Sequence, residues 1–205
     1  EQKKRGYDFV TPPHIANLNL YRTSGHYPFY KDSQFPPIEM PEGDQYMLKP
    51  MNCPHHHQIY LAKPRSYRDL PVRLAEFGTV YRYEQSGEMN GLIRVRGFTQ
   101  DDGHIFCRED QIESEVESVL GAIKDALATY RIDYWMRLSL RDPENIEKYL
   151  GEGATWDRAE TLMRDLLVAK GIDFKEALGE AAFYGPKIDI MAVDALGRQW
   201  QISTI

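Results

Sequence analysis

Cysteine is scarce in this chain of 205 residues, which has only two, Cys53 and Cys107. Two cysteines cannot make the disulfide framework of a small secreted domain, so we expect a reducing, cytoplasmic environment. Long apolar stretches are also missing, and no run approaches the ~20 residues that a membrane-spanning helix needs. The polar, basic residues 1–7 are not followed by an apolar segment, which argues against a secretory signal.

A surplus of positive charge is also absent. The chain has 25 Lys and Arg against 31 Asp and Glu, which gives a formal net charge of -6. A protein that coats nucleic acid needs a positive surplus to neutralise phosphates. Local basic residues such as Arg82, Arg94 and Arg96 therefore favour a small phosphate ligand over a long duplex.

Hydrophobic periodicity predicts an α+β fold, a mainly antiparallel sheet with helices against one face. The clearest strands are residues 73–84 and 93–106, which a polar loop joins into a long hairpin. Further strands are expected at residues 7–11, 46–49, 134–140, 183–193 and 198–205. Helices are expected at residues 15–21, 55–62, 110–127 and 155–171, and a proline-rich loop at 27–44.

Both ends of the chain suggest a longer parent protein. Residues 1–6 are typical of the last turn of a helix closed by glycine, and residues 199–205 are typical of a strand with no turn after it. We therefore expect residues 1–205 to be part of a larger domain.

One face of the second hairpin strand carries side chains suited to a polar ligand. Side chains two residues apart point to the same face of a strand, which groups Arg96, Phe98, Gln100, Asp102 and His104. An arginine, an aromatic ring, an amide, a carboxylate and an imidazole on one face predict a floor for a charged, planar ligand.

The first hairpin strand adds Arg82 and Glu84 on a shared face. Arginine fits phosphate or carboxylate in a bidentate manner, and Phe98 offers a flat surface for a base. With Glu84 as acceptor for an exocyclic amine, the set would hold a purine nucleotide. A surface ladder of ion pairs between neighbouring strands explains the same spacing equally well.

Two smaller patterns are ambiguous by themselves. Cys53 and His104 are ligand types for zinc, with residues 55–57, all histidine, beside Cys53. A small buried cysteine and ordinary helix histidines explain them as well. The turn before Lys187 has a backbone fixed by Gly185 and Pro186, which would project one cation from a rigid base. An ordinary turn with a solvated lysine is the alternative.

Taken together, these segments resemble a known family. The pattern Arg82-x-Glu84, a loop and then Arg96-Gly-Phe98 resembles the second signature motif of class II aminoacyl-tRNA synthetases. Residues 7–13, a strand closed by proline, are similar to the end of their first motif. The strings at 49–54, 66–71, 94–106 and 182–187 resemble threonyl-tRNA synthetases in particular. Seryl and prolyl members share the general motifs but not the pairing of Cys53 with His104.

The resemblance implies roles in nucleotide binding and catalysis. Arg82 would bridge the α-phosphate of ATP and the amino-acid carboxylate. Glu84 would accept from the adenine amine, Phe98 would stack on the ring, and Arg96 would hold the outer phosphates. Lys187 would face the reacting phosphate and carboxylate. One further residue, His26, matches a histidine that assists transfer to the tRNA ribose.

The resemblance also implies a threonine pocket and a metal. Gln100, Asp102, Tyr184 and Gln201 would line the pocket, and Cys53 and His104 would be two of three zinc ligands. Zinc that binds the substrate's amine and hydroxyl together would reject valine, by ~10⁴-fold or more for a site built around a hydroxyl. Serine keeps the hydroxyl and would be rejected poorly.

The implied activity is that of a threonine–tRNA ligase. Threonine's carboxylate attacks the α-phosphate of ATP, pyrophosphate leaves, and the 3′ ribose of tRNA-Thr takes the acyl group. Mg²⁺ would accompany ATP, and the first motif implies a homodimer in the parent protein.

The resemblance places several expected parts outside this sequence. The third motif and the third zinc ligand are expected beyond Ile205, and the N-terminal editing and C-terminal anticodon-binding domains are not in the sequence. Residues 1–205 are therefore expected to be a partial catalytic domain, weakly active or inactive alone.

Three other readings stay open. The chain could be another synthetase of the same subgroup. Measuring which amino acid drives ATP–pyrophosphate exchange would distinguish the two. It could be a non-catalytic, synthetase-like RNA-binding or regulatory paralogue, although Arg82, Glu84, Arg96, Phe98 and Lys187 are all present. It could also be an isolated metal-binding domain, which would leave the arginines unexplained.

Overall fold

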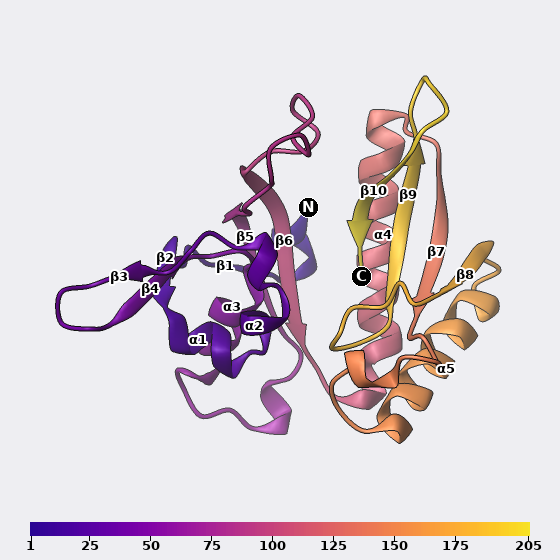
Figure 1. Cartoon of the computed structure of the whole chain (residues 1–205). Coiled ribbons are helices and arrows are strands. Elements are labelled where there is room, and N and C mark those ends of the chain that lie inside the picture. Colours follow the sequence, from indigo (N-terminus) through magenta and orange to yellow (C-terminus); the bar gives the residue numbers. More distant parts are fainter. The chain divides into compact units, whose positions relative to one another are not determined.

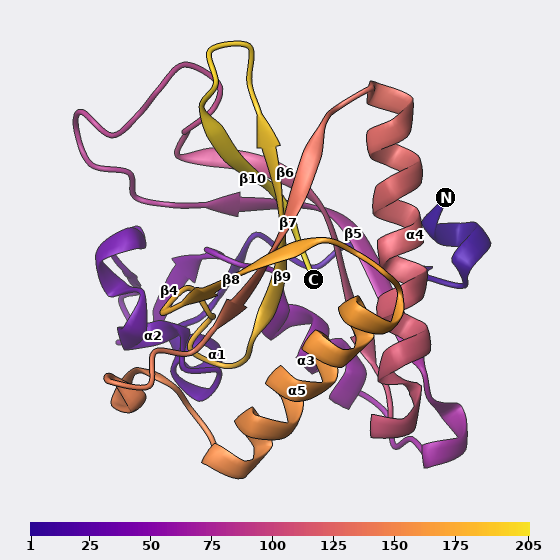
Figure 2. The same cartoon turned by 90° about the vertical axis from the view of Figure 1, so that its right-hand side faces the viewer.

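The computed structural model describes residues 1–205 and contains two compact units, Glu1–Gln111 and Ile112–Ile205. Each unit combines strands with helices, as Figures 1 and 2 show, and five of the seven strand pairings are antiparallel. The predicted α+β fold is therefore confirmed. No helix is long and apolar enough to cross a membrane.

A long hairpin dominates the first unit. Strand β5 (Val72–Tyr81) pairs antiparallel with β6 (Gly97–Phe106) along its whole length, and β1 (Asp8–Phe9) pairs with β5 in parallel. Along β6, exposed and half-buried residues alternate from Gly97 to His104, because successive side chains point to opposite faces. The loop between the two strands extends beyond their ends (Figure 1).

A second, smaller sheet completes the first unit. Strand β4 (Gln45–Leu48) lies between β2 (Ile15–Asn17) and β3 (Ile38–Glu39). The α-helices of the unit are α1 (Leu18–Thr23), α2 (His26–Phe29) and α3 (Cys53–Leu61). Its hydrophobic cluster has three buried members, which come from α1 and β4: Leu18, Tyr21 and Met47.

The second unit is a four-stranded sheet with two helices on one face. The strand order is β10 (Gln199–Thr204), β9 (Lys187–Val193), β7 (Tyr134–Leu140) and β8 (Phe174–Leu178). Helices α4 (Ile112–Tyr130) and α5 (Gly153–Ala169) pack against the sheet (Figure 2). The core residues of β7 and β9 alternate along each strand, so they share one face: Met136, Leu138, Leu140, Ile188 and Ile190.

Several predicted boundaries need correction. The strands form three sheets rather than one, and the hairpin ladder ends at Tyr81 and Gly97, so residues 82–84 and 93–96 are not strand. Residues 15–17 form β2 and only 18–23 are helical. The expected loop 27–44 contains β3, and β8 was not predicted. The glycine ending at Gly6 is confirmed, because a short 3-10 helix (Gln2–Arg5) stops there with φ 79°.

Candidate active site

The side chains predicted to share one face of β6 do so from Phe98 to His104. Phe98, Gln100, Asp102 and His104 are half-buried, whereas the residues between them are exposed. Arg96 precedes the strand and does not belong to its ladder. The strand thus places a ring, an amide, a carboxylate and an imidazole in a row on one face.

Arg82 lies beside the start of this row. Its guanidinium carbon is 5.2 Å from the centre of the Phe98 ring, and its backbone N–H donates to the Arg96 carbonyl at 2.9 Å. Burial lowers the pKa of Arg82, although the charge of Glu84 acts in the opposite direction. The arrangement brings one cation and one aromatic surface together, as phosphate and base recognition require.

The other two residues of the predicted nucleotide set already have partners. Arg96 Nε donates to the backbone carbonyl of Glu84 at 2.9 Å, and its guanidinium lies 5.3 Å from the Tyr83 ring. The Glu84 carboxylate accepts from Arg94 Nε at 2.9 Å. Because the Arg94 side chain is 57% exposed, that ion pair is weak and can open for a ligand.

Asp102 is fixed by a residue that the sequence did not single out. Asn52 Nδ2 donates to Asp102 Oδ2 at 2.8 Å, and Asn52 is buried. A Cβ atom on Gly78 would stand 2.4 Å from Asn52 Nδ2, so the close approach requires glycine there. The only sequence signal was an asparagine immediately before Cys53, and its burial is visible only in the structure.

Cys53 and His104 lie in the same electrostatic environment. Burial raises the pKa of the Cys53 thiol to about 12, and the charge of Asp102 adds to that rise. Burial lowers the pKa of His104 to about 4, while Asp102 opposes the change. Asp102 therefore lies within electrostatic reach of both residues.

A chain of buried polar groups leads away from His104. His104 Nδ1 lies 2.8 Å from His56 Nδ1. His56 Nε2 lies 3.2 Å from Glu76 Oε1, close enough for attraction although not aligned for a hydrogen bond. Glu76 in turn pairs with Lys49 at 3.3 Å, and both side chains are buried. The sequence indicated His56 only as one of three histidines beside Cys53, and it did not connect Glu76 or Lys49 with this site.

The carboxylate selects the histidine tautomers. Burial lowers the pKa of His56 and of His104, which favours neutral rings. The charge of Glu76, 3.2 Å from His56 Nε2, favours the neutral His56 tautomer with its proton on that nitrogen, and in this tautomer Nδ1 accepts from His104 Nδ1. His104 Nε2 then carries the lone pair, which is the form that binds metals.

The donor types fit zinc, although the shell is incomplete within this chain. A thiolate and a neutral imidazole are ligands that zinc takes in proteins, and Cys53 and His104 supply one of each. No three His, Cys, Asp or Glu side chains in residues 1–205 are grouped so that they could hold a metal ion. Any zinc site here needs further ligands.

His26 belongs to the same unit. It begins the short helix α2, is 4% exposed, and its Nδ1 lies 2.9 Å from Ser24 Oγ. Burial lowers its pKa, and the charge of His57 adds to the effect. A mainly neutral, buried imidazole can accept a proton.

Three predicted residues lie in the second unit. Tyr184 is 59% exposed and packs edge-on against Phe183. Lys187 Nζ donates to both oxygens of Asp189, at 3.0 and 2.8 Å. The exposed Gln201 donates from Nε2 to Thr204 Oγ1 at 2.6 Å. Lys187 and Gln201 are therefore linked to one buried carboxylate, because Thr204 Oγ1 also donates to Asp189 Oδ1.

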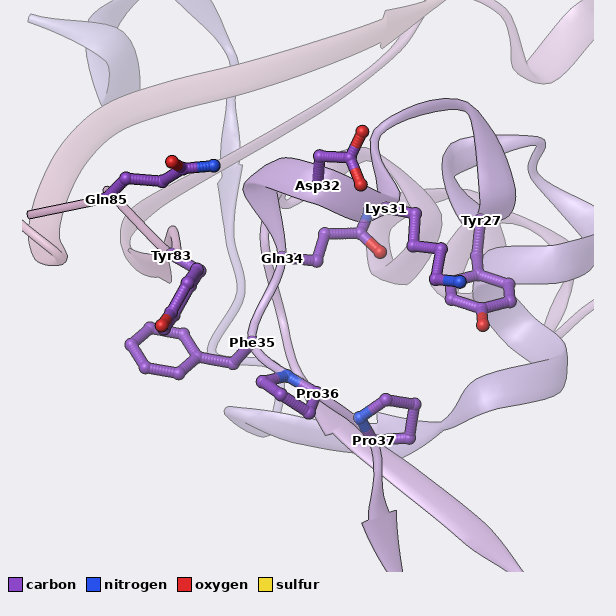
Figure 3. A pocket seen from close by; sticks show the side chains of 9 residues that line it. All are labelled: Tyr27, Lys31, Asp32, Gln34, Phe35, Pro36, Pro37, Tyr83 and Gln85. Atoms are coloured by element: carbon purple, nitrogen blue, oxygen red, sulfur yellow. The ribbon is translucent and has the colours of Figure 1, made fainter.

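A pocket of about 320 Å³ in the first unit lies next to the hairpin loop. Figure 3 shows Tyr83 facing Phe35 there, with their ring centres 5.5 Å apart. The lining residues come from the 27–37 segment and from the start of the loop: Tyr27, Lys31, Asp32, Gln34, Phe35, Pro36, Pro37, Tyr83 and Gln85. None of the predicted site residues lines it, but Tyr83 lies under Arg96, and Gln34 Nε2 donates to the His26 carbonyl at 2.9 Å.

Known proteins match this chain throughout. A family model, the class II core domain of tRNA synthetases (G, H, P, S and T), matches residues 37–205. A threonine–tRNA ligase of Chloroherpeton thalassium is 57% identical over 210 residues, which cover 100% of this chain and 32% of that protein. The chain thus spans about a third of the length of the curated relatives it matches.

Solved structures agree with the sequence matches. The RNA-binding domain of threonyl-tRNA synthetase from Cryptosporidium parvum is 42% identical with a TM-score of 0.91, covering 98% of this chain and 49% of that one. A threonyl-tRNA synthetase structure from Aeropyrum pernix is 38% identical with a TM-score of 0.87, covering 99% and 47%. The chain belongs to the class II aminoacyl-tRNA synthetases, and the relatives it resembles in that family are threonine–tRNA ligases.

Proposed function

We propose that this chain is part of a threonine–tRNA ligase and carries residues that activate threonine with ATP. The observation that supports it most directly is the row on β6, where Arg82 stacks on Phe98 and Asn52 holds Asp102. A surface ladder of ion pairs explains neither the partial burial of these groups nor a carboxylate held by a buried asparagine.

The chemistry requires positioning and charge neutralisation more than covalent participation. Threonine's carboxylate oxygen attacks the α-phosphorus of ATP, and pyrophosphate leaves. Arg82 would neutralise the α-phosphate as charge builds up, and Phe98 would hold the adenine. Arg96 would bind the outer phosphates, together with the Mg²⁺ of the nucleotide. Lys187 would neutralise the reacting phosphate and carboxylate.

Substrate choice would depend on Cys53 and His104. Both fit zinc by ligand type, and the tautomer set by His56 and Glu76 leaves His104 Nε2 ready to bind metal. When bound, zinc supplies a Lewis acid for the amine and hydroxyl of the amino acid. Asp102, oriented by Asn52, would accept a hydrogen bond from that hydroxyl or amine.

The second half-reaction would transfer threonine to the 3′ ribose of tRNA-Thr. His26, held by Ser24 and mainly neutral, is the proposed acceptor for the ribose proton. With a net charge of -6 on the chain, we propose that recognition here is confined to the end of the tRNA. The homodimer and the cytoplasmic location of the parent protein are proposed from the family.

Binding of aminoacyl-adenylate analogues tests the proposal. We expect calorimetry with zinc present to detect the non-hydrolysable threonyl analogue, with the seryl analogue next and the valyl analogue weaker by up to ~10⁴-fold. Arg82→Gln should weaken binding at least about tenfold, because a charge-assisted contact is lost. The control is Arg65→Gln, since Arg65 also stacks on a ring, that of Tyr60 at 4.6 Å, outside the proposed site.

Two results would count against the proposal. The prolyl analogue could bind better than the threonyl one, which would point to another member of the subgroup. Alternatively, no analogue could bind although ATP does, which would favour a paralogue that has lost amino-acid activation.

A further inference from the structure

Asp189 is a buried carboxylate that the proposed chemistry does not use. It lies in β9, is 0% exposed, and is flanked in sequence by the core residues Ile188 and Ile190. Burying a carboxylate is costly unless charged and hydrogen-bonding partners compensate. Its burial therefore calls for a specific set of donors.

Four side chains supply those donors. Lys187 contacts both carboxylate oxygens, and Ser139 Oγ donates to Oδ2 at 2.7 Å. Arg137 donates to Oδ2 from two nitrogens, at 2.9 and 3.3 Å. Thr204 Oγ1 donates to Oδ1 at 2.7 Å. Burial alone would raise the pKa of Asp189, but these hydrogen bonds, led by that of Lys187, hold it below its usual range.

Lys187 lies in β9 itself, and the other three donors come from the two strands that flank β9. Asp189 lies directly opposite Arg137 on β7 and opposite Thr204 on β10. Ile188 and Ile190 point to the helices, so Asp189 and Lys187 lie on the other face of the sheet. A polar row thus crosses three strands on the face away from the hydrophobic core.

Lys187, at one end of this network, has a role in the proposed function, and Gln201, at the other end, is a threonine-pocket residue by family resemblance. Lysine has a flexible stem, and here its ammonium is tied to both oxygens of one carboxylate. Gln201 Nε2 donates to Thr204, which fixes the amide and leaves its carbonyl oxygen without a partner in the chain. That oxygen can accept from an amine or hydroxyl.

We propose that Asp189 is a positioning residue that orients Lys187 directly and Gln201 through Thr204 for binding of the amino acid and its adenylate. The inference rests on the proposed function, because Lys187 takes its role from it and the threonine pocket to which the resemblance assigns Gln201 belongs to the same reaction. Asp189 itself touches no substrate. Its effect is to remove the conformational freedom that Lys187 and Gln201 would otherwise lose on binding.

The test compares two carboxylate variants from the same hairpin. Asp189→Asn keeps the shape but removes the charge, and we expect it to weaken both ATP and the threonyl-adenylate analogue about tenfold. Asp194→Asn is the matched control. Asp194 accepts from Arg198 and Trp200 in the β9–β10 turn and contacts neither Lys187 nor Gln201. Asp194→Asn should change the affinities for ATP and for the threonyl-adenylate analogue by less than about twofold.

A third variant separates positioning from general stability. Thr204→Val, at an exposed position, removes the bridge to Gln201 and with it one donor to Asp189, but leaves Lys187 on both carboxylate oxygens. It should weaken the threonyl analogue about threefold to tenfold and leave ATP binding unchanged. A purely structural role would instead lower both affinities in proportion to the loss of folded protein, measured by circular dichroism.

The outcomes separate the two ideas. If the unmodified chain and a folded Asp189→Asn variant bind equally well, and Thr204→Val binds like them, the positioning role is wrong while the proposed function stands. If Asp189→Asn does not fold, Thr204→Val decides alone: a loss confined to the threonyl analogue supports the role, and no loss overturns it. If the unmodified chain binds no analogue, the proposed function fails and the positioning role with it.

Discussion

Gly78 marks the point where β5 passes closest to the side chain of Asn52. Alternation along the strand gives Gly78 no special place in the sequence, and its backbone needs no unusual conformation. The requirement is one of space, because any Cβ would overlap the amide that holds Asp102. One missing side chain on β5 thus determines where a carboxylate on β6 points.

Gly78→Ala should therefore displace Asn52 and release Asp102. We expect the free energy of unfolding to fall by about 1–3 kcal/mol, as for other overpacked sites. Urea denaturation followed by circular dichroism would measure it. Gly97→Ala on the paired strand is the control, since its Cβ would meet Tyr81 at an ordinary 3.5 Å. Equal stability of the two variants would show that Asn52 has room to move.

Among the elements, the β5–β6 hairpin shows what local pattern can predict. The face shared by Phe98 and His104 follows from alternation, which depends only on the strand itself. The predicted strands were too long because Arg96 Nε takes the Glu84 carbonyl, which a continued ladder would have used. That contact depends on how the loop folds, and the sequence pattern does not contain it.

The polar network around Asp189 in β9 could not be predicted from the sequence for a related reason. In sequence, Asp189 between two isoleucines looks like an outward, solvated residue of an amphipathic strand. Its burial arises from Arg137, which is 52 residues away, and from Thr204 on the next strand. The family resemblance predicted Lys187 and Gln201 as site residues. Only the pairing of the strands shows that Asp189 and Thr204 connect them.

Asp189 should also make the second unit sensitive to acid. Its folded pKa lies below the ordinary carboxyl value of about 4, so its contribution to stability is complete above that pH and is lost as pH falls through the folded pKa. We expect urea unfolding, followed by tryptophan fluorescence, to show that the free energy of unfolding declines between about pH 5 and 2. The decline should be smaller in the Asp189→Asn variant. Parallel pH curves for the two proteins would contradict this.

At the scale of the whole chain, the two units differ in what stabilises them. The hydrophobic core of the second unit contains ten buried residues, whereas the cluster of the first contains three. The first unit instead buries Lys49, Glu76, His55 and His56. Buried polar groups of this kind contribute little net stability, so the first unit has more to gain from a bound ligand.

Zinc should accordingly protect the first unit. At a hundredfold excess over its dissociation constant, a ligand specific for the folded state adds about 2.7 kcal/mol. Slower amide hydrogen exchange in β6 on zinc addition would report it. His56→Ala should reduce zinc affinity at least about tenfold by freeing His104, as loss of such partners does elsewhere.

His57→Ala is the matched control for the zinc measurement. His57 lies on the same helix and has a ring contact with His104, but it forms no hydrogen bond with it. If both variants lose zinc equally, or if β6 exchanges at the same rate with and without zinc, His56 does not orient the ligand. Tryptophan fluorescence cannot replace amide hydrogen exchange as the readout for the first unit, because Trp135, Trp156 and Trp200 all belong to the second unit.

The position of Asp189 opposite Arg137 and Thr204 has a consequence for folding itself. Strands that slip by one residue exchange their two faces, and a slip of β9 would drive this charge among the leucines of the helices while exposing Ile188 and Ile190. A pairing of the three strands that is misaligned by one residue would thus bury the charge of Asp189 in the hydrophobic core without its hydrogen-bond donors. The carboxylate that holds Lys187 therefore also destabilises any strand register that would turn Lys187 toward the hydrophobic core.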